Sequence, residues 1–284
     1  MSEPITITTS DGATLHTRTY PLTGVRARAR LVLLHGYGDH SGRYEHFAAW
    51  LVERGIAIHT FDFRGMGQSS GARGFVARWD EYLTDLETFL DTLPADGLPL
   101  FILGHSHGGL VLAIAGIRGV LNGRVAGCLF SAPYLKNRVP VPPGKLLLAQ
   151  VGNILAPSMA VPTDILDEVM TSDAEMLAQS RSDPNVQHIA TPRWFLEMQR
   201  AQAEAANLAG DFRLPLLMLI AGKDELADEG AIERFVAGVG SEDKAVRRYE
   251  ELRHELLRET DREAIFTEIF GWMENRLVGK EQVV

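Results

Sequence analysis

The sequence predicts an α/β domain with a mostly parallel central sheet and helices on both faces. Short, largely apolar runs recur along the chain, and helical patterns separate several of them. One stretch of roughly 80 residues contains no strand-like run, which is too long for an ordinary connection. The 284 residues are enough for one large domain with a sizeable core.

The predicted strands fall into two kinds. Residues 5–9 and 14–20 alternate apolar and polar side chains around the turn-forming sequence Ser10-Asp11-Gly12, which predicts a hairpin. The later runs are almost wholly apolar, which is typical of strands that are buried on both faces of a parallel sheet. These runs are residues 30–34, 56–61, 100–104, 125–130 and 216–221.

Helical patterns at residues 43–53, 79–93 and 110–121 alternate with these strands, so the sheet is expected to carry helices on both faces. The alternation stops after Phe130. We therefore expect a helical cap at residues 135–211, inserted into a discontinuous core formed by residues 1–134 and 212–284. The predicted core ends with helices at 231–239 and 262–277 and a strand at 245–249.

Composition excludes several classes of function. The net charge of −9, from 28 basic and 37 acidic residues, disfavours a nucleic-acid partner. The single cysteine, Cys128, lies in an apolar run and is predicted to be a buried core residue. No signal-peptide pattern and no membrane-length apolar run occurs, which predicts a cytoplasmic protein. No cluster of residues has metal-ligand spacing, so no metal is expected.

Gly104-His105-Ser106-His107-Gly108 matches the pattern G-x-S-x-G, follows an apolar strand and opens a helical pattern. This context predicts a tight, strained turn that presents the Ser106 hydroxyl above the sheet, with a helix N-terminus behind it. Side chains at the two glycine positions would collide with neighbouring elements. The five-residue pattern also occurs by chance, and only its context favours a nucleophile.

Four segments together resemble the α/β-hydrolase fold, and more closely its monoacylglycerol lipase and lysophospholipase branch, which includes serine aminopeptidase-like members. The segments are LLHGYGDHSGRYEHFAAWL (33–51), FDFRGMGQSSGARG (61–74), LGHSHGG (103–109), and the tail from AGKDELAD (221–228) to YEELRHELLRE (249–259). They cover nearly the whole chain except the cap. That branch more often has methionine after the serine, where this chain has His107.

A serine hydrolase of this fold needs an acid after a late strand and then a histidine, in that chain order. Asp224 follows the strand at 216–221, and the resemblance singles it out from Glu225 and Asp228. Asp228 is instead expected to cap the next helix. His254 lies in the last loop before the final helix, which predicts the catalytic base there.

His105 and His107 flank the serine but are poor candidates for the base. In a nucleophile elbow the preceding residue points toward the sheet or a neighbouring loop, and the following one begins the helix. Neither side chain can easily align a ring nitrogen with the serine hydroxyl while a carboxylate orients it. Their adjacency to Ser106 therefore argues against this role.

Acyl transfer also needs two N–H donors for the developing oxyanion. One is expected from the backbone of His107, the residue after the nucleophile. By resemblance, the other is the backbone N–H of Tyr37, in the loop that follows the strand at 30–34. The expected supporting residues of this loop and of the elbow are His35, Gly36, Gly38, Gly104 and Gly108.

The predicted function is hydrolysis of a carboxylic ester through an acyl-enzyme, without a cofactor. The apolar cap segments and the resemblance favour a monoacylglycerol or lysophospholipid-type ester, and an exposed cap could dimerise or contact a membrane surface transiently. A thioesterase or an amide or peptide hydrolase with the same triad remains an alternative, as does a non-catalytic small-molecule-binding homologue. Haloalkane dehalogenases and epoxide hydrolases normally need an aspartate nucleophile, so Ser106 argues against them.

Overall fold

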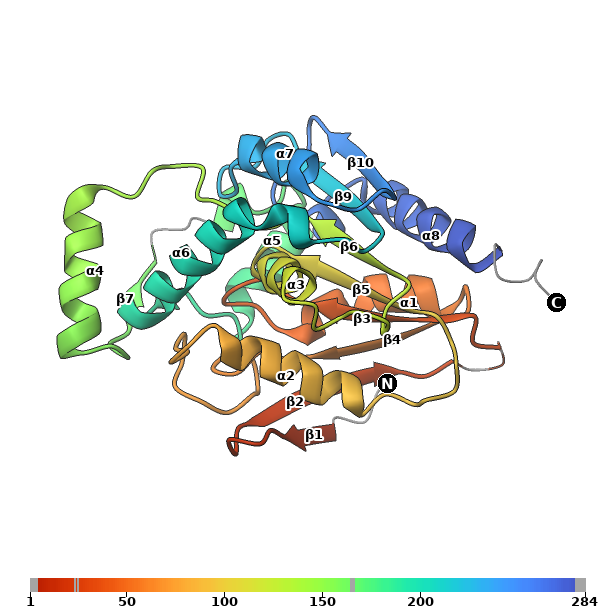
Figure 1. Ribbon diagram of the computed structural model, residues 1–284, viewed down its shortest axis with the longest axis horizontal. Helices are drawn as coiled ribbons and strands as arrows, with labels where there is room; N and C mark the ends of the chain where they lie inside the picture. The colour runs from red at the N-terminus through yellow and green to blue at the C-terminus, as the bar shows by residue number, and fades with distance from the viewer. Residues whose placement is uncertain (1–4, 23, 25, 164–166, 279–284) are drawn as a thin grey trace.

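The computed structural model describes residues 5–22, 24, 26–163 and 167–278. Within them, a sheet of 8 strands runs through the molecule in the order β1-β2-β4-β3-β5-β6-β9-β10 (Figure 1). Only the β1–β2 and β2–β4 pairs are antiparallel, and the other neighbours are parallel. The predicted α/β architecture, with a mostly parallel sheet, is therefore confirmed.

The strands lie where the apolar runs predict them, within one or two residues. They are β1 (Ile5–Thr8), β2 (Thr14–Tyr20), β3 (Ala29–Leu34), β4 (Ile56–Phe61), β5 (Leu100–His105), β6 (Gly127–Ser131), β9 (Leu216–Ala221) and β10 (Lys244–Tyr249). The helices of the core are α1 (Glu45–Val52), α2 (Asp80–Asp91), α3 (His107–Ile117), α7 (Glu229–Gly238) and α8 (Arg262–Val278). Asp228 caps α7 as predicted, since its carboxylate accepts a hydrogen bond from Ala231 N at 2.7 Å.

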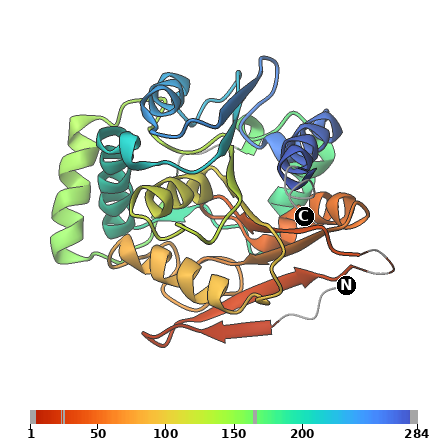
Figure 2. The same cartoon turned by 45° about the vertical axis from the view of Figure 1, so that its right-hand side comes forward.

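Helices cover both faces of the sheet, as Figures 1 and 2 show. α1 and α8 pack on one face, and α2, α3 and α7 pack on the other. Successive side chains of a strand point to opposite faces. In β3, Leu31 and Leu33 accordingly join the apolar cluster under α1 and α8. Val32 and Leu34 join the cluster under α2, α3 and α7. This two-sided burial explains why the central strands lack polar alternation.

In its described residues, the segment predicted as a cap contains three α-helices and two short strands. These elements are α4 (Pro143–Leu155), β7 (Val161–Pro162), α5 (Ala174–Ser182), β8 (Ile189–Ala190) and α6 (Pro192–Asn207). The expectation that this segment holds no strand is wrong, because β7 pairs antiparallel with β8. Two residues are too few to produce a periodic pattern in the sequence. Residues 164–166 of the segment lie outside the described residues.

The helices of this segment differ sharply in burial. α6 packs against α3 and contributes Trp194 and Met198 to the apolar core. α4 packs on α6 at the edge of the molecule, and none of its residues is buried (Figure 2). α6 is thus an integral layer of the fold, while α4 is an outer layer.

The elbow between β5 and α3 is held by backbone contacts that leave no room for a side chain. A Cβ atom on Gly104 would lie 2.5 Å from Gly108 O, and one on Gly108 would lie 2.3 Å from Leu34 O. Gly108 N donates to His35 O at 3.1 Å. The N-terminus of α3 therefore lies directly against the end of β3. This close contact fixes the position of Ser106, the residue between β5 and α3.

We expect Gly108→Ala to destabilise the fold by about 1–3 kcal/mol, because the new methyl group meets backbone that cannot move aside. Urea denaturation followed by circular dichroism measures this change. Gly144→Ala in α4 is the matched control, since nothing lies within 4 Å of its added methyl group. The control should be neutral or slightly stabilising. Equal stability of the two variants would contradict the close contact.

Candidate active site

Ser106 has the strained backbone that a nucleophile elbow requires. Its φ of 49° and ψ of −113° lie in a region that L-residues rarely adopt. Neighbouring elements hold this conformation: Ser106 N donates to Ser131 O at 3.0 Å, and Ser106 O accepts from Tyr134 N at 2.9 Å. The side chain is partly exposed at the N-terminus of α3. The predicted turn is therefore present, with the hydroxyl at its outer edge.

Asp224, His254 and Ser106, far apart in the sequence, form one hydrogen-bonded line. His254 Nε2 lies 2.8 Å from Ser106 Oγ, and His254 Nδ1 lies 2.7 Å from Asp224 Oδ2. Asp224 follows β9, and its other oxygen accepts from the N–H groups of Leu226 and Ala227 at 2.8 and 2.9 Å. The carboxylate thus fixes the imidazole with the proton on Nδ1 and leaves Nε2 to accept from the serine.

The electrostatics of the line favour a basic imidazole. Burial of His254 disfavours the imidazolium and lowers its pKa, but the Asp224 carboxylate outweighs burial, so the pKa lies above the ordinary value of 6.5. Burial likewise raises the pKa of Asp224, but His254 and the two backbone N–H groups outweigh it and lower the pKa. The pair is therefore arranged to take up a proton at the histidine.

The loop after β3 lies against the elbow as predicted. A Cβ atom on Gly36 would approach Ser106 Cβ to 3.6 Å. His35 supports the loop, because its Nδ1 lies 2.7 Å from Gly36 O and its Nε2 accepts from Phe63 N at 2.9 Å. Gly38 has a φ of +71°, and a Cβ atom there would lie 2.4 Å from Gln187 O.

The two N–H groups predicted to bind an oxyanion remain available. Within the described ranges, neither Tyr37 N nor His107 N donates to a backbone carbonyl of a turn, loop or helix cap. His107 is also the first residue of α3, whose N-terminus carries a partial positive charge. His107 directly follows Ser106 in the chain, and Tyr37 follows Gly36, whose position lies against Ser106.

The His107 side chain lies in an aromatic box beneath the elbow. It is fully buried, and in the described part of the chain neither ring nitrogen has a hydrogen-bond partner. Its ring centroid lies 4.9 to 6.0 Å from those of Tyr37, Phe63, Trp79, Tyr82 and Trp194. Burial lowers its pKa to about 3, so the ring is neutral and packs like another aromatic edge.

His105 is not in contact with the serine hydroxyl. Its Nδ1 lies 3.0 Å from Ser131 O, and its ring centroid lies 5.0 Å from that of His254. Burial lowers the pKa of His105 to about 4, with a smaller contribution from His254. It therefore carries no charge near neutral pH. Cys128 is buried in β6, as predicted.

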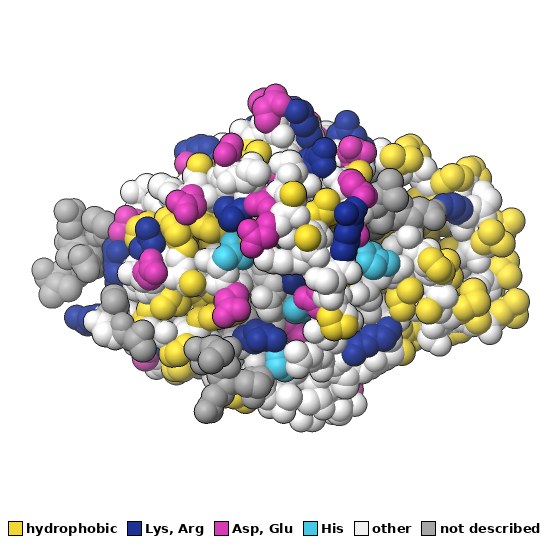
Figure 3. Space-filling view, turned by 180° about the vertical axis from the view of Figure 1, so that it is seen from behind, with side chains coloured by type: hydrophobic (Ala, Val, Ile, Leu, Met, Phe, Trp, Pro, Cys, Tyr) yellow, Lys and Arg dark blue, Asp and Glu magenta, His cyan; other side chains and the backbone are white. Residues whose placement is uncertain are grey.

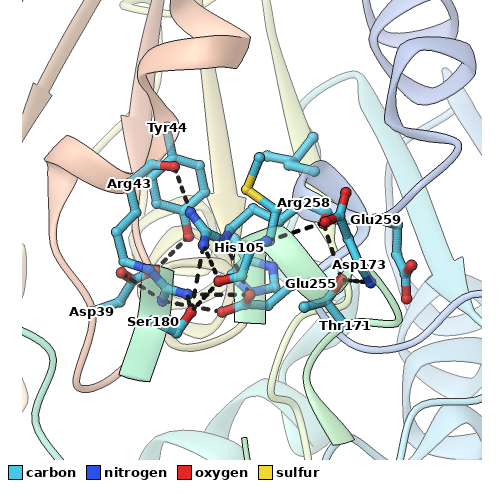
Figure 4. A network of polar contacts seen from close by, with 12 residues as sticks. Asp39, Arg43, Tyr44, His105, Thr171, Asp173, Ser180, Glu255, Arg258 and Glu259 are labelled. Carbon is cyan, nitrogen blue, oxygen red and sulfur yellow. Dashed lines mark hydrogen bonds and ion pairs between the residues drawn. The ribbon is translucent and has the colours of Figure 1, made fainter. Parts of the chain in front are cut away.

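A buried ionic network lies behind the histidine, and sequence reasoning missed it (Figure 4). Glu255 is 3% exposed, and its carboxylate lies 3.1 Å from both Arg43 and Arg258. Arg43 also pairs with Asp39 at 2.9 Å, and Tyr44 Oη donates to the same aspartate at 2.8 Å. Two acids and two arginines thus balance their charges in the interior. The only signal in the sequence is that all four lie in the motif segments 33–51 and 249–259.

The segment predicted as a cap also holds the His254 loop. Glu255 N donates to Met170 O at 2.7 Å, Arg258 Nη2 donates to Met176 O at 3.0 Å, and Ser180 bonds Arg43. These contacts place α5 and the residues before it against the back of the site. Part of the insertion therefore supports the loop that carries His254.

No group of three or more His, Cys, Asp or Glu side chains within the described residues could hold a metal ion. None of the described helices combines the length and the apolar character that crossing a bilayer requires.

Fold and geometry together define the class: an α/β-hydrolase with a serine at its nucleophile elbow. A model of the family described as serine aminopeptidase, S33, matches residues 25–261, and the chain belongs to this family.

The chain is also similar to named proteins, of which two are sequence relatives and one, a solved structure, shows the fold. Phospholipase YtpA of Bacillus subtilis is 31% identical over 246 residues, which cover 85% of this chain and 93% of the relative. The monoacylglycerol lipase of Mycolicibacterium smegmatis is 29% identical over 88% of this chain and 89% of its own length. The structure of a soluble variant of monoglyceride lipase from Saccharomyces cerevisiae superposes with a TM-score of 0.87 at 24% identity, and covers 97% of this chain and 96% of that one.

The charges around His254 predict a pH dependence. Glu255 adds to the rise in the pKa of His254 that Asp224 causes, so Glu255→Gln should lower that pKa. The acid limb of kcat/KM, which reports deprotonation of the base, should then move to lower pH by up to about one unit. Stopped-flow or plate assays from pH 4.5 to 9 on a p-nitrophenyl ester would measure it.

Glu250→Gln is the charge-matched control, because Glu250 is exposed and pairs with Arg248 at 2.8 Å. This control variant should not shift the acid limb of the kcat/KM profile. Circular dichroism at each assay pH checks that the Glu255 variant stays folded. An unmoved limb in a folded Glu255→Gln variant would contradict the role of the network.

Proposed function

We propose that this protein hydrolyses carboxylic esters through an acyl-enzyme formed on Ser106. The observation that carries the proposal is the line in which His254 bridges the Ser106 hydroxyl at 2.8 Å and the Asp224 carboxylate at 2.7 Å. Ser106 Oγ attacks the acyl carbon while His254 Nε2 takes the hydroxyl proton. The C–O bond to the alcohol then breaks, and the alcohol leaves with that proton. His254 then deprotonates a water molecule, which attacks the acyl carbon. The bond to Ser106 Oγ breaks, His254 returns the proton to the serine, and the acid is released.

Two backbone donors would stabilise the charge that develops in each step. In this proposal the donors are the N–H groups of Tyr37 and His107, and the N-terminus of α3 adds its partial positive charge. Asp224 keeps the imidazole in the productive tautomer and stabilises the imidazolium. The reaction needs no group beyond these side chains and amides.

We infer that the substrate is a monoacylglycerol or a lysophospholipid-type ester. The relatives with high coverage carry the names phospholipase, monoacylglycerol lipase and monoglyceride lipase, which supports a lipid ester. The family description also names an aminopeptidase, so amide hydrolysis is the second candidate.

A substrate panel distinguishes these classes. It contains monoacylglycerols of increasing chain length, a lysophospholipid, a thioester and amino-acid anilides. Faster turnover of an anilide than of any glyceride would overturn the inference.

We expect Ser106→Ala to lose about three or more orders of magnitude in kcat on every ester of this panel. A fluorophosphonate should label the parent protein at Ser106 and leave the variant unlabelled, as read by mass spectrometry. Ser182→Ala, at an exposed serine of α5, is the control and should keep full activity. Near-full activity in Ser106→Ala, or a label on another residue, would refute the assignment.

We further propose that residues 135–211 act as a cap and that α4 docks on a lipid surface. Most of the exposed large apolar side chains in the described residues lie between Val139 and Val161. In α4, Leu148 is 72% and Leu155 is 78% exposed, and no acidic residue lies in the helix. Figure 3 shows these apolar side chains gathered at one end of the molecule. A substrate that resides in a bilayer or micelle makes a lipid surface the matching partner.

Leu148 and Leu155 are seven residues apart and so share one face of α4. We expect Leu148→Ser with Leu155→Ser to weaken binding to phosphatidylcholine vesicles at least about tenfold, since burying each leucine contributes about 1.5–3 kcal/mol. Flotation measures binding, and hydrolysis of vesicle-embedded monooleoylglycerol measures its consequence. Activity on a soluble short-chain ester should not change.

Ile5→Ser is the control, because Ile5 is also exposed but lies on edge strand β1. It should bind vesicles like the parent. Unchanged vesicle binding in the double variant would contradict docking through α4. A concentration-dependent dimer that the double variant abolishes, seen by light scattering without vesicle binding, would instead identify a second copy as the partner.

A further inference from the structure

Three aromatic rings meet directly behind the two expected oxyanion donors. Tyr37 and Trp194 are stacked, with ring centroids 3.6 Å apart and planes inclined by 26°. His107 lies 5.8 Å from Tyr37 and 6.0 Å from Trp194, ring centre to ring centre. Two of these residues donate through their backbones beside Ser106. The third, Trp194, comes from α6 of the insertion and is 5% exposed.

A second contact ties Tyr37 to α6 independently of the stacking. The carbonyl of Gly74 accepts from Tyr37 Oη at 3.1 Å and from Thr191 Oγ1 at 2.8 Å. Thr191 is the N-cap of α6 and accepts from Trp194 N at 3.3 Å. Gly74 has a φ of +65°, and a Cβ atom there would lie 2.7 Å from Tyr37 Oη. The Tyr37 phenol and the start of α6 therefore donate to the same carbonyl oxygen. The residue that carries this carbonyl, Gly74, has no room for a side chain.

α6 is held against the core at this end, so it can serve as a fixed support. Glu197, one turn beyond the aromatic contact, accepts from Trp79 N at 3.0 Å. Arg193 donates to Ala77 O at 3.3 Å. Trp79 is itself one of the rings around His107, with centroids 5.2 Å apart.

We propose that Trp194 is a positioning residue for the oxyanion hole, because its indole holds the side chains of both residues whose backbone N–H groups bind the oxyanion. The inference rests on the proposed ester hydrolysis. An N–H group stabilises the transition state only where it is aimed in advance at the developing charge. The Tyr37 loop contains glycine on either side, so its backbone is held mainly by what its side chain contacts. Through Trp194, α6 orients the two N–H groups of the oxyanion hole without contacting the substrate's reacting atoms.

Trp194→Ala should lower kcat about 10- to 100-fold, which is part of the roughly 10²–10³-fold loss expected when a whole donor is removed. KM for a short p-nitrophenyl ester should stay within about twofold, because the interaction strengthens only in the transition state. Trp194→Phe keeps a flat ring for Tyr37 and should recover most of the loss. Circular dichroism and thermal melting report whether each variant is folded.

A tetrahedral inhibitor separates positioning from a structural role. An alkyl trifluoromethyl ketone adds Ser106 Oγ to its carbonyl and places an oxyanion in the hole, while the matching methyl ketone reports ground-state binding. In Trp194→Ala the affinity for the trifluoromethyl ketone should fall in parallel with kcat, and the affinity for the methyl ketone should not change.

Met198→Ala is the matched control, since Met198 is 1% exposed and lies one turn farther along α6. It should lose stability but change kcat and the ketone affinity only a few-fold. Equal kinetic losses in the Trp194 and Met198 variants would overturn the proposal. If Trp194→Ala does not fold, Trp194→Leu carries the same comparison. A parent protein without esterase activity and without fluorophosphonate labelling would instead refute the proposed function itself.

Discussion

The site depends on one contact: the N-terminus of α3 lies so close to the ends of β3 and β5 that no side chain fits between them. The Gly104 and Gly108 positions meet backbone oxygen atoms at 2.5 and 2.3 Å where a Cβ would be. This approach forces Ser106 into its positive-φ conformation and raises its hydroxyl above the sheet. It also brings the β3 loop, with Tyr37, beside the first amide of α3. The proposed nucleophile and the two proposed donors therefore share one small region, because a helix and a sheet meet without intervening side chains.

The histidine reaches this region by a different means, a loop held by charges in the interior. This network consists of four charged side chains that are each less than a tenth exposed: Glu255, Arg43, Arg258 and Asp39. Burying four charges is costly unless all are paired. Removing one partner leaves an uncompensated charge, so the network strongly specifies one arrangement of the loop. Arg258 donates to Arg43 O beside α1 and to Met176 O in α5. The His254 loop is therefore tied both to the core and to the insertion.

The predictable parts of the molecule are those that local chemistry dictates. β4 and β9 begin and end where their apolar runs do, and Asp228 caps α7 because a short carboxylate satisfies an amide three residues away. The β7–β8 pair escaped prediction because its strands have two residues each and their pairing is long-range. The Glu255 network was not predicted because charged residues are normally exposed. Only pairing with partners from distant segments makes their burial possible.

The sequence by itself determined the alternating β/α core, the serine at a strand-to-helix turn, and the chain order of serine, acid and histidine. Periodicity, glycine spacing and local motifs carry that information within a few residues. Only the tertiary structure decided that the loop after β3 lies against the start of α3. It also decided that the His107 imidazole is a neutral ring in an aromatic box, and that α6 stacks Trp194 on Tyr37. These features arise between side chains far apart in the sequence, where packing and not local pattern selects the contact.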